Sequence, residues 1–147
     1  MVNYDIVGAL KTQARTNGYL FLYGETWMQN ISADQLALLD SSLVLTCDPF
    51  TAQPTMDNGV IEQIVYSGAI ALGQKFTDGH NANLDETHLQ KWEIRLKDLS
   101  LALSNFIAAF SCNNELDVSG ITFRLDMNKF DTNIDFVAAT VSFTQHP

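Results

Sequence analysis

The stretch LQKWEIRLKDLSLALSNFIAAF, residues 89–110, limits the fold of this chain more than any other feature. Its large apolar residues recur at spacings of three and four, which brings them onto one face of an α-helix. They are Leu89, Trp92, Leu96, Leu99, Leu103, Phe106 and Phe110. A face of this size must be covered, either by a sheet of the same chain or by another subunit. We expect the chain's own sheet, because three heptads are short for a free coiled coil.

Capping residues predict where the helices begin and end. A first helix is expected over roughly residues 3–16, with Asn3 as the N-cap and Gly18 as the C-terminal stop. The long helix is expected to begin near Asp85 and to close at Asn113. The chain therefore combines one short helix at its start with one long helix in its second half.

Alternation of apolar and polar residues predicts the strands. Aromatic and β-branched runs favour strands at residues 19–29, 42–47 and 59–76, and a terminal hairpin of 120–127 with 134–144. The inward row of the first hairpin strand is expected to be Ile121, Phe123, Leu125 and Met127. The order of elements predicts one α+β domain over residues 1–147, in which a single, mainly antiparallel sheet packs against the long helix.

Residues 48–59, DPFTAQPTMDNG, are expected to form a loop, because they hold two prolines, a DNG turn signal and almost no periodicity. The loop carries apolar residues that look exposed, and we predict that they contact another subunit or a partner: Pro49, Phe50, Pro54 and Met56. The strand that follows, 59–76, is apolar on both faces and about twice the mean strand length. It is therefore expected to be central and to extend beyond the body of the domain.

The charge of the chain bears on which partners it can have. The formal net charge is −9, and residues 16–74 contain no Lys or Arg against six acids. Tight binding to DNA or RNA phosphates requires clustered basic residues, so specific nucleic-acid binding is not expected. No apolar run is long enough to cross a bilayer, and the first residues lack the pattern of a secretory signal, so no membrane partner is expected either.

Motifs of known chemistry do not emerge from the sequence. The histidines His80, His88 and His146 lack metal-ligand spacing. Asp131, Asn133 and Asp135 imitate the start of a calcium loop, but the required Gly and Glu are absent from its later positions, which favours polar residues of a hairpin turn. We expect no cofactor, no metal and no enzymatic activity, although a carboxylate couple such as Asp57 with Glu62 stays open.

The two cysteines are expected to be free thiols. Cys47 and Cys112 lie far apart in the sequence and belong to no CxxC pair. In a chain without an export signal, buried free thiols are the default, and a disulfide has no support.

The order of elements resembles that of the tail-terminator and head–tail joining proteins of tailed bacteriophages. The stretches that carry the resemblance are YLFLYGETW, SLVLTCDPF, GVIEQIVYSGAIALGQKF and the terminal GITFRLDMNKFDTNIDFVAATVSF. In those proteins an N-terminal helix precedes strands, a proline-containing loop, a long strand, a helix and a final β-hairpin. The long helix of this chain lies later and runs longer than that pattern.

The resemblance implies a structural virion protein that is made in the host cytoplasm and forms a closed ring of six or more copies. Its partners would be further copies of itself and neighbouring neck or tail proteins, and DNA would pass through the ring. An acidic lumen would let DNA pass without adhering, because like charges repel.

Two other classes of function stay open on the residues alone. One is a small ligand-binding or enzymatic α+β domain with its pocket between the long helix and the sheet, which would be stabilised by a metabolite. The other is a non-viral adaptor module that uses residues 48–59, in which Phe50 and Met56 would be needed for a partner.

Overall fold

The structure is a computed structural model, and it describes residues 4–24, 38, 42–75, 89–127 and 134–147. Its elements are α1 (Ile6–Thr16), β1 (Leu20–Tyr23), β2 (Val44–Cys47), β3 (Thr51–Asp57), β4 (Val60–Lys75), a π-helical turn η2 (Trp92–Leu96), α4 (Lys97–Asn113), β5 (Asp117–Met127) and β6 (Ile134–Gln145). The strands form one sheet in the order β1-β2-β4-β6-β5, and β3 pairs with β4 outside this path.

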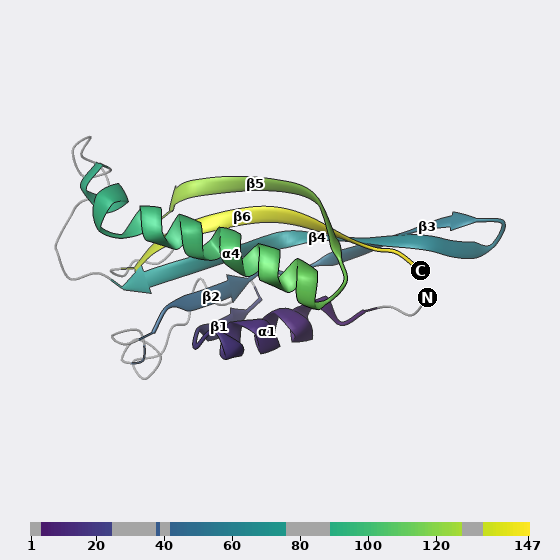
Figure 1. Cartoon of the computed structure of the whole chain (residues 1–147), viewed down its shortest axis with the longest axis horizontal. Coiled ribbons are helices and arrows are strands. Elements are labelled where there is room, and N and C mark those ends of the chain that lie inside the picture. The colour runs from purple at the N-terminus through teal and green to yellow at the C-terminus, as the bar shows by residue number, and fades with distance from the viewer. Residues whose placement is uncertain (1–3, 25–37, 39–41, 76–88, 128–133) are drawn as a thin grey trace.

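Figure 1 shows both helices on the same face of this sheet. The pairing of β1 with β2 is parallel, whereas β2–β4, β3–β4, β4–β6 and β5–β6 are antiparallel. The prediction of an α+β fold with one mainly antiparallel sheet, one long helix, a short N-terminal helix and a C-terminal hairpin is confirmed.

Helix α1 begins later than expected. Asp5 caps it by accepting a hydrogen bond from the backbone N–H of Gly8 at 3.0 Å, and the predicted cap, Asn3, lies outside the described residues. The helix ends as predicted at Asn17, and Gly18 follows with a φ of +76°, a backbone conformation that glycine adopts without steric cost. Leu10 and Ala14 are fully buried, so the helix packs one apolar side onto the core.

The apolar stripe of the long helix packs against the chain's own sheet, as predicted. Leu96, Leu99, Leu103, Phe106 and Phe110 are buried, and they form one core with Ile64, Tyr66 and Ile70 of β4 and with Val137 and Phe143 of β6. Trp92 is half-buried against this core. Each large side chain buried in this way stabilises the fold by about 1.5–3 kcal/mol.

Leu89 is the exception, since its side chain is 65% exposed, and its predicted burial is wrong. The π-helical turn η2 separates it from the rest of the stripe. A π turn adds one residue to the helical repeat, so residues before the turn are rotated relative to those after it. Lys91 is buried in place of Leu89.

The predicted loop 48–59 is wrong for most of its length, because residues Thr51–Asp57 form the strand β3. The prolines suggested a loop, but an edge strand tolerates a proline whose missing N–H would face away from its partner. The expected turn lies at Asn58 and Gly59, whose φ angles of +50° and +80° match the two-residue turn of a tight hairpin.

The hairpin of β5 with β6 is confirmed. Ile121 and Phe123 pair with the core residues Val141 and Ala139, so they lie on the inward face as expected, but the row is not fully buried. Ile121 and Leu125 are 41% and 42% exposed, while Phe123 is half-buried against the core. The side chain of Met127 lies outside the described residues. The cause is position, because β5 is the last strand of the sheet order and so has a neighbour on one side only.

Candidate functional site

The most distinctive part of the molecule is the outer end of the long strand β4. β6 pairs with β4 only from Ile64 to Lys75, whereas β3 pairs with it from Val60 to Ser67. The outer part of β4 therefore has β3 as its single neighbour. Together they form a two-stranded arm that projects from the body along the long axis of the molecule (Figure 1). We define the arm as residues 51–63. The prediction that this strand continues past the body is confirmed.

The two faces of the arm carry different side chains. A bulge places Thr55 opposite Gln63 but Met56 opposite Ile61, so Glu62 has no direct partner on β3. The extra residue reverses the alternation of β4, and Ile61 rather than Val60 packs towards the helices. Because directly paired residues share a face, Met56 lies on the face of Ile61, and Asp57 lies on the opposite face with Val60.

Both faces of the arm are open to solvent. The structure places two of the predicted interface residues, Pro54 and Met56, together on one face, and the side chain of Met56 is 58% exposed. Val60 on the other face is 66% exposed. The arm therefore presents an apolar side chain to solvent on each of its faces.

The root of the arm is tightly packed. Phe50 is half-buried, and its ring stacks on Phe143 with a centroid distance of 6.5 Å. The same ring lies directly over Gly68, where an added Cβ would come within 2.5 Å of it. Pro49, beside it, is exposed. Phe50 therefore differs from the other predicted interface residues, because its ring packs on Phe143 and Gly68 and so holds the arm to the body.

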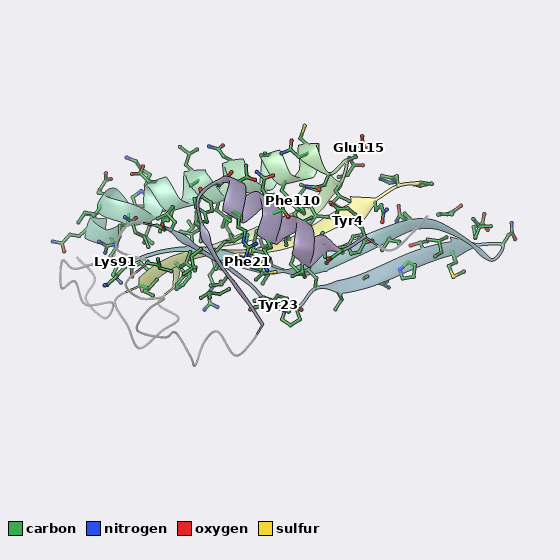
Figure 2. All side chains as sticks on the ribbon, turned by 90° about the horizontal axis from the view of Figure 1, so that it is seen from below. Tyr4, Phe21, Tyr23, Lys91, Phe110 and Glu115 are labelled. Atoms are coloured by element: carbon green, nitrogen blue, oxygen red, sulfur yellow. The ribbon has the colours of Figure 1, made fainter. Side chains whose placement is uncertain are left out.

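A chain of hydrogen bonds also anchors the arm root. The Tyr66 hydroxyl accepts a hydrogen bond from the backbone N–H of Tyr4 and donates one to Gln145 Oε1, both at 2.8 Å. The Tyr4 hydroxyl in turn donates to Asn114 Oδ1. Burial, with smaller effects from the charge of Asp5 and from Tyr66, raises the pKa of Tyr4. Figure 2 shows Tyr4 on the side of the body from which the arm projects.

A buried ion cluster lies towards the opposite end of the body, where Figure 2 labels Lys91. The Asp135 carboxylate is fully buried and accepts hydrogen bonds from Lys91 Nζ at 2.9 Å and from Arg95 Nε and Nη2 at 3.0 and 2.7 Å. These bonds fasten the start of the long helix to β6. The carboxylate is thus occupied by two cations, which suits a structural role better than the calcium loop that its sequence imitates.

Sequence reasoning missed this cluster. It placed Asp135 in a hairpin turn with Asp131 and Asn133, both of which lie outside the described residues. The sequence feature that could have indicated the cluster is the spacing of Lys91 and Arg95, which puts two cations on one side of the helix. Asp135, at the start of a buried strand, is the acid that they face. Their burial was hidden because the π-helical turn displaces the apolar stripe at this end.

The two cysteines are both free, and they differ in burial. Cys47 is fully buried in the core, and burial together with the nearby charge of Asp48 raises the pKa of its thiol to about 12. Cys112 is exposed near the end of α4, so its predicted burial is wrong.

Features for catalysis or metal binding do not assemble in the part of the chain that the structure describes. His80 and His88 lie outside it, and His146 pairs with Asp117 at 3.0 Å on an exposed surface. No group of three or more His, Cys, Asp or Glu residues in the described ranges could hold a metal ion. Asp57 and Glu62, the carboxylate couple considered above, are both exposed on the arm. Within the same ranges, no helix is long and apolar enough to span a membrane.

Comparison with known proteins leaves the arm as the main guide to function. No known protein family matches the chain, and no characterised protein is significantly similar to it in sequence.

Proposed function

We propose that this chain is a structural virion protein of a tailed bacteriophage, a component of the head–tail connector or tail-terminator type that assembles into a closed ring. Copies of the chain, six or more, contact one another head to tail, and neighbouring neck or tail proteins bind the finished ring. The protein is made in the host cytoplasm and functions in the virion. DNA passes through the ring without being read.

The projecting arm is the observation that carries this proposal. A two-stranded hairpin alone in water is marginally stable, because it buries little apolar surface. Here the arm exposes Met56 and Val60 instead of folding back onto the body. A segment of this kind is best explained if another molecule covers it. Copies that meet through an arm on one side and a body on the other make a repeated head-to-tail contact, which closes into a ring when its rotation leads back to the first copy.

The charge and the site chemistry support a role in assembly. The net charge of −9 disfavours adhesion to DNA, as a protein around a DNA channel requires. In the described ranges the two ends of the body hold a structural ion cluster and a packed arm root. Neither presents an accessible reacting group to a substrate.

Removal of the arm tests the proposal. Thr55 and Gln63 are directly paired, so Asn-Gly in place of residues 56–62 closes the hairpin with a turn of the preferred type. Light scattering after size-exclusion chromatography is expected to give a discrete oligomer for the full chain and a monomer for the shortened one. The circular dichroism spectrum and the cooperative unfolding of the body are expected to persist in both.

The matched control is Leu101→Ala, because Leu101 is 62% exposed on α4, away from the arm. It is expected to assemble as the full chain does. A full chain that stays monomeric from micromolar to near-millimolar concentration would refute the ring. A monomer whose melting temperature rose with a metabolite would favour a ligand-binding or enzymatic domain instead.

A further inference from the structure

The outer side of helix α1 is a second surface that no element covers in the part of the chain that the structure describes. It carries Lys11 and Arg15, which are exposed, and the helix contains no acidic residue between Ile6 and Thr16. Neither cation makes an ion pair with any residue that the structure describes. Side chains four residues apart on a helix lie about 5–6 Å from each other at their Cβ atoms, so the two form one basic patch.

The arm has the opposite charge. It contains Asp57 and Glu62, both exposed, and no Lys or Arg. Asp57 lies directly opposite Val60, and Glu62 is the bulged residue two positions further along β4, so both acids lie in the outer part of the arm. The bulge leaves Glu62 without a directly paired residue on β3, and its side chain is exposed.

Within one molecule these two surfaces do not meet. The tip of the arm lies at the far end of the long axis, and α1 lies against the body in both views (Figures 1 and 2). A second copy can bring them together. We infer that the arm of one subunit docks on α1 of the next, where Asp57 and Glu62 pair with Lys11 and Arg15.

Apolar contacts accompany the ion pairs. Val60 is 66% exposed on the same arm face as Asp57. Val7 is partly buried one helical turn before Lys11, and so lies beside the basic patch. Docking places Val60 next to Val7, and it removes water from around the charges, which strengthens their attraction.

Other partners fit the basic patch less well. Two cations are too few for tight binding to nucleic-acid phosphates, and the chain as a whole is strongly acidic. Arg124 is a further exposed cation, but no second cation lies on β5, so it cannot match a pair of acids. The inference rests on the proposed ring, since it names the surfaces that make each ring contact.

Charge reversal tests the contact. The double variant Lys11→Glu with Arg15→Glu and the double variant Asp57→Lys with Glu62→Lys are each expected to weaken assembly by roughly tenfold or more in Kd. The chain that carries all four changes is expected to assemble again, because the two surfaces remain complementary with their signs exchanged. Sedimentation velocity measures the three variants against the unaltered chain.

Two single variants control for net charge. Arg124→Glu and Asp98→Lys change the charge of exposed side chains outside the two surfaces, and both are expected to leave the Kd within about twofold, since isolated surface charges contribute little. Zero-length carbodiimide cross-linking gives a second readout. It is expected to join Lys11 to Asp57 or Glu62. In a mixture of isotopically light and heavy copies, the joined peptides are expected to include light–heavy pairs, which only a link between copies can give.

The outcomes separate the inference from the proposed function. The docking of the arm on α1 is overturned if the ring persists in both double variants, or if combining all four changes does not restore it. Neither result contradicts the proposal that the unaltered chain forms a ring. Cross-links confined to single copies overturn it as well. A full chain that forms no oligomer refutes the ring and the contact together.

Discussion

The strand β4 passes through two regions that differ in what stabilises them. In the body, Ile64, Ile70 and Leu72 are buried, and the strand has a neighbour on each side. In the arm, the same strand exposes Val60 and Glu62 and pairs with β3 alone. Folding therefore requires apolar residues in the body part of β4, whereas it places few demands on the residues of the arm, which can be suited to a partner. Substitutions in each region can test this division.

Asp135→Asn should destabilise the body most. The substitution removes the negative charge that faces Lys91 and Arg95 in a buried site, and breaking one partner of a buried ion pair costs about 3–5 kcal/mol in the free energy of unfolding. Urea unfolding followed by circular dichroism measures the loss. Asp117→Asn, an exposed acid on β5, is the control. Equal stability of the two variants would contradict a structural role for the buried cluster.

Gly68→Ala should have a smaller effect at the junction of the two regions. The new Cβ would lie about 2.5 Å from the ring of Phe50, which must move away from Phe143. Overpacking of this kind costs about 1–3 kcal/mol in unfolding free energy. The matched control is Gly120→Ala, because nothing lies within 4 Å of a Cβ added at Gly120. If both alanines were tolerated equally in urea unfolding, the arm root would not be rigidly packed.

Cys47 should make stability depend on pH in the alkaline range. Burial raises the pKa of its thiol from 9.0 to about 12, so the unfolded chain loses this proton at a lower pH than the folded chain does. The contribution is therefore fully present below about pH 9 and is lost progressively as the pH rises towards 12. The unfolding free energy of the unaltered chain should fall more steeply above pH 9 than that of Cys47→Ala. Parallel curves for the two proteins would contradict the burial of the thiol.

Met56→Ser should show the smallest effect on folding, and it probes the arm. Met56 is 58% exposed, and surface substitutions change the unfolding free energy by less than about 0.5 kcal/mol. Assembly is expected to weaken all the same, because the side chain is available to a partner. A loss of several kcal/mol in urea unfolding, with no change in the oligomer seen by light scattering, would mean that the arm serves the body and not an interface.

Much of the body could be predicted from the sequence because its signals are periodic. The stripe from Leu96 to Phe110 and the apolar residues of β4 repeat as a packed helix and a covered strand require. The exposure of Ile121 and Leu125 could not be predicted in this way, since alternation identifies the faces of a strand and not its place in the sheet. Burial of those faces depends on strand order, which is set by tertiary contacts.

The arm and the ion cluster were harder to predict for local reasons. Pro54 has no N–H, which suggests a loop unless the residue is known to lie at an edge. The bulge at Glu62 and the π-helical turn at Trp92–Leu96 each insert one residue into a regular repeat, and the sequence carries no motif for either. Both insertions occur next to the features that we connect with assembly or with anchoring of the long helix.

The irregular pairing of β5 has a consequence for solubility. An open edge strand with apolar side chains can recruit further strands and so seed fibrils. The register of β5 shifts between Val118 and Gly120 and again between Arg124 and Met127, which leaves only residues 120–124 with regular geometry. So short a template supports little cross-β growth. The open edge of β5 is thereby steered away from amyloid growth.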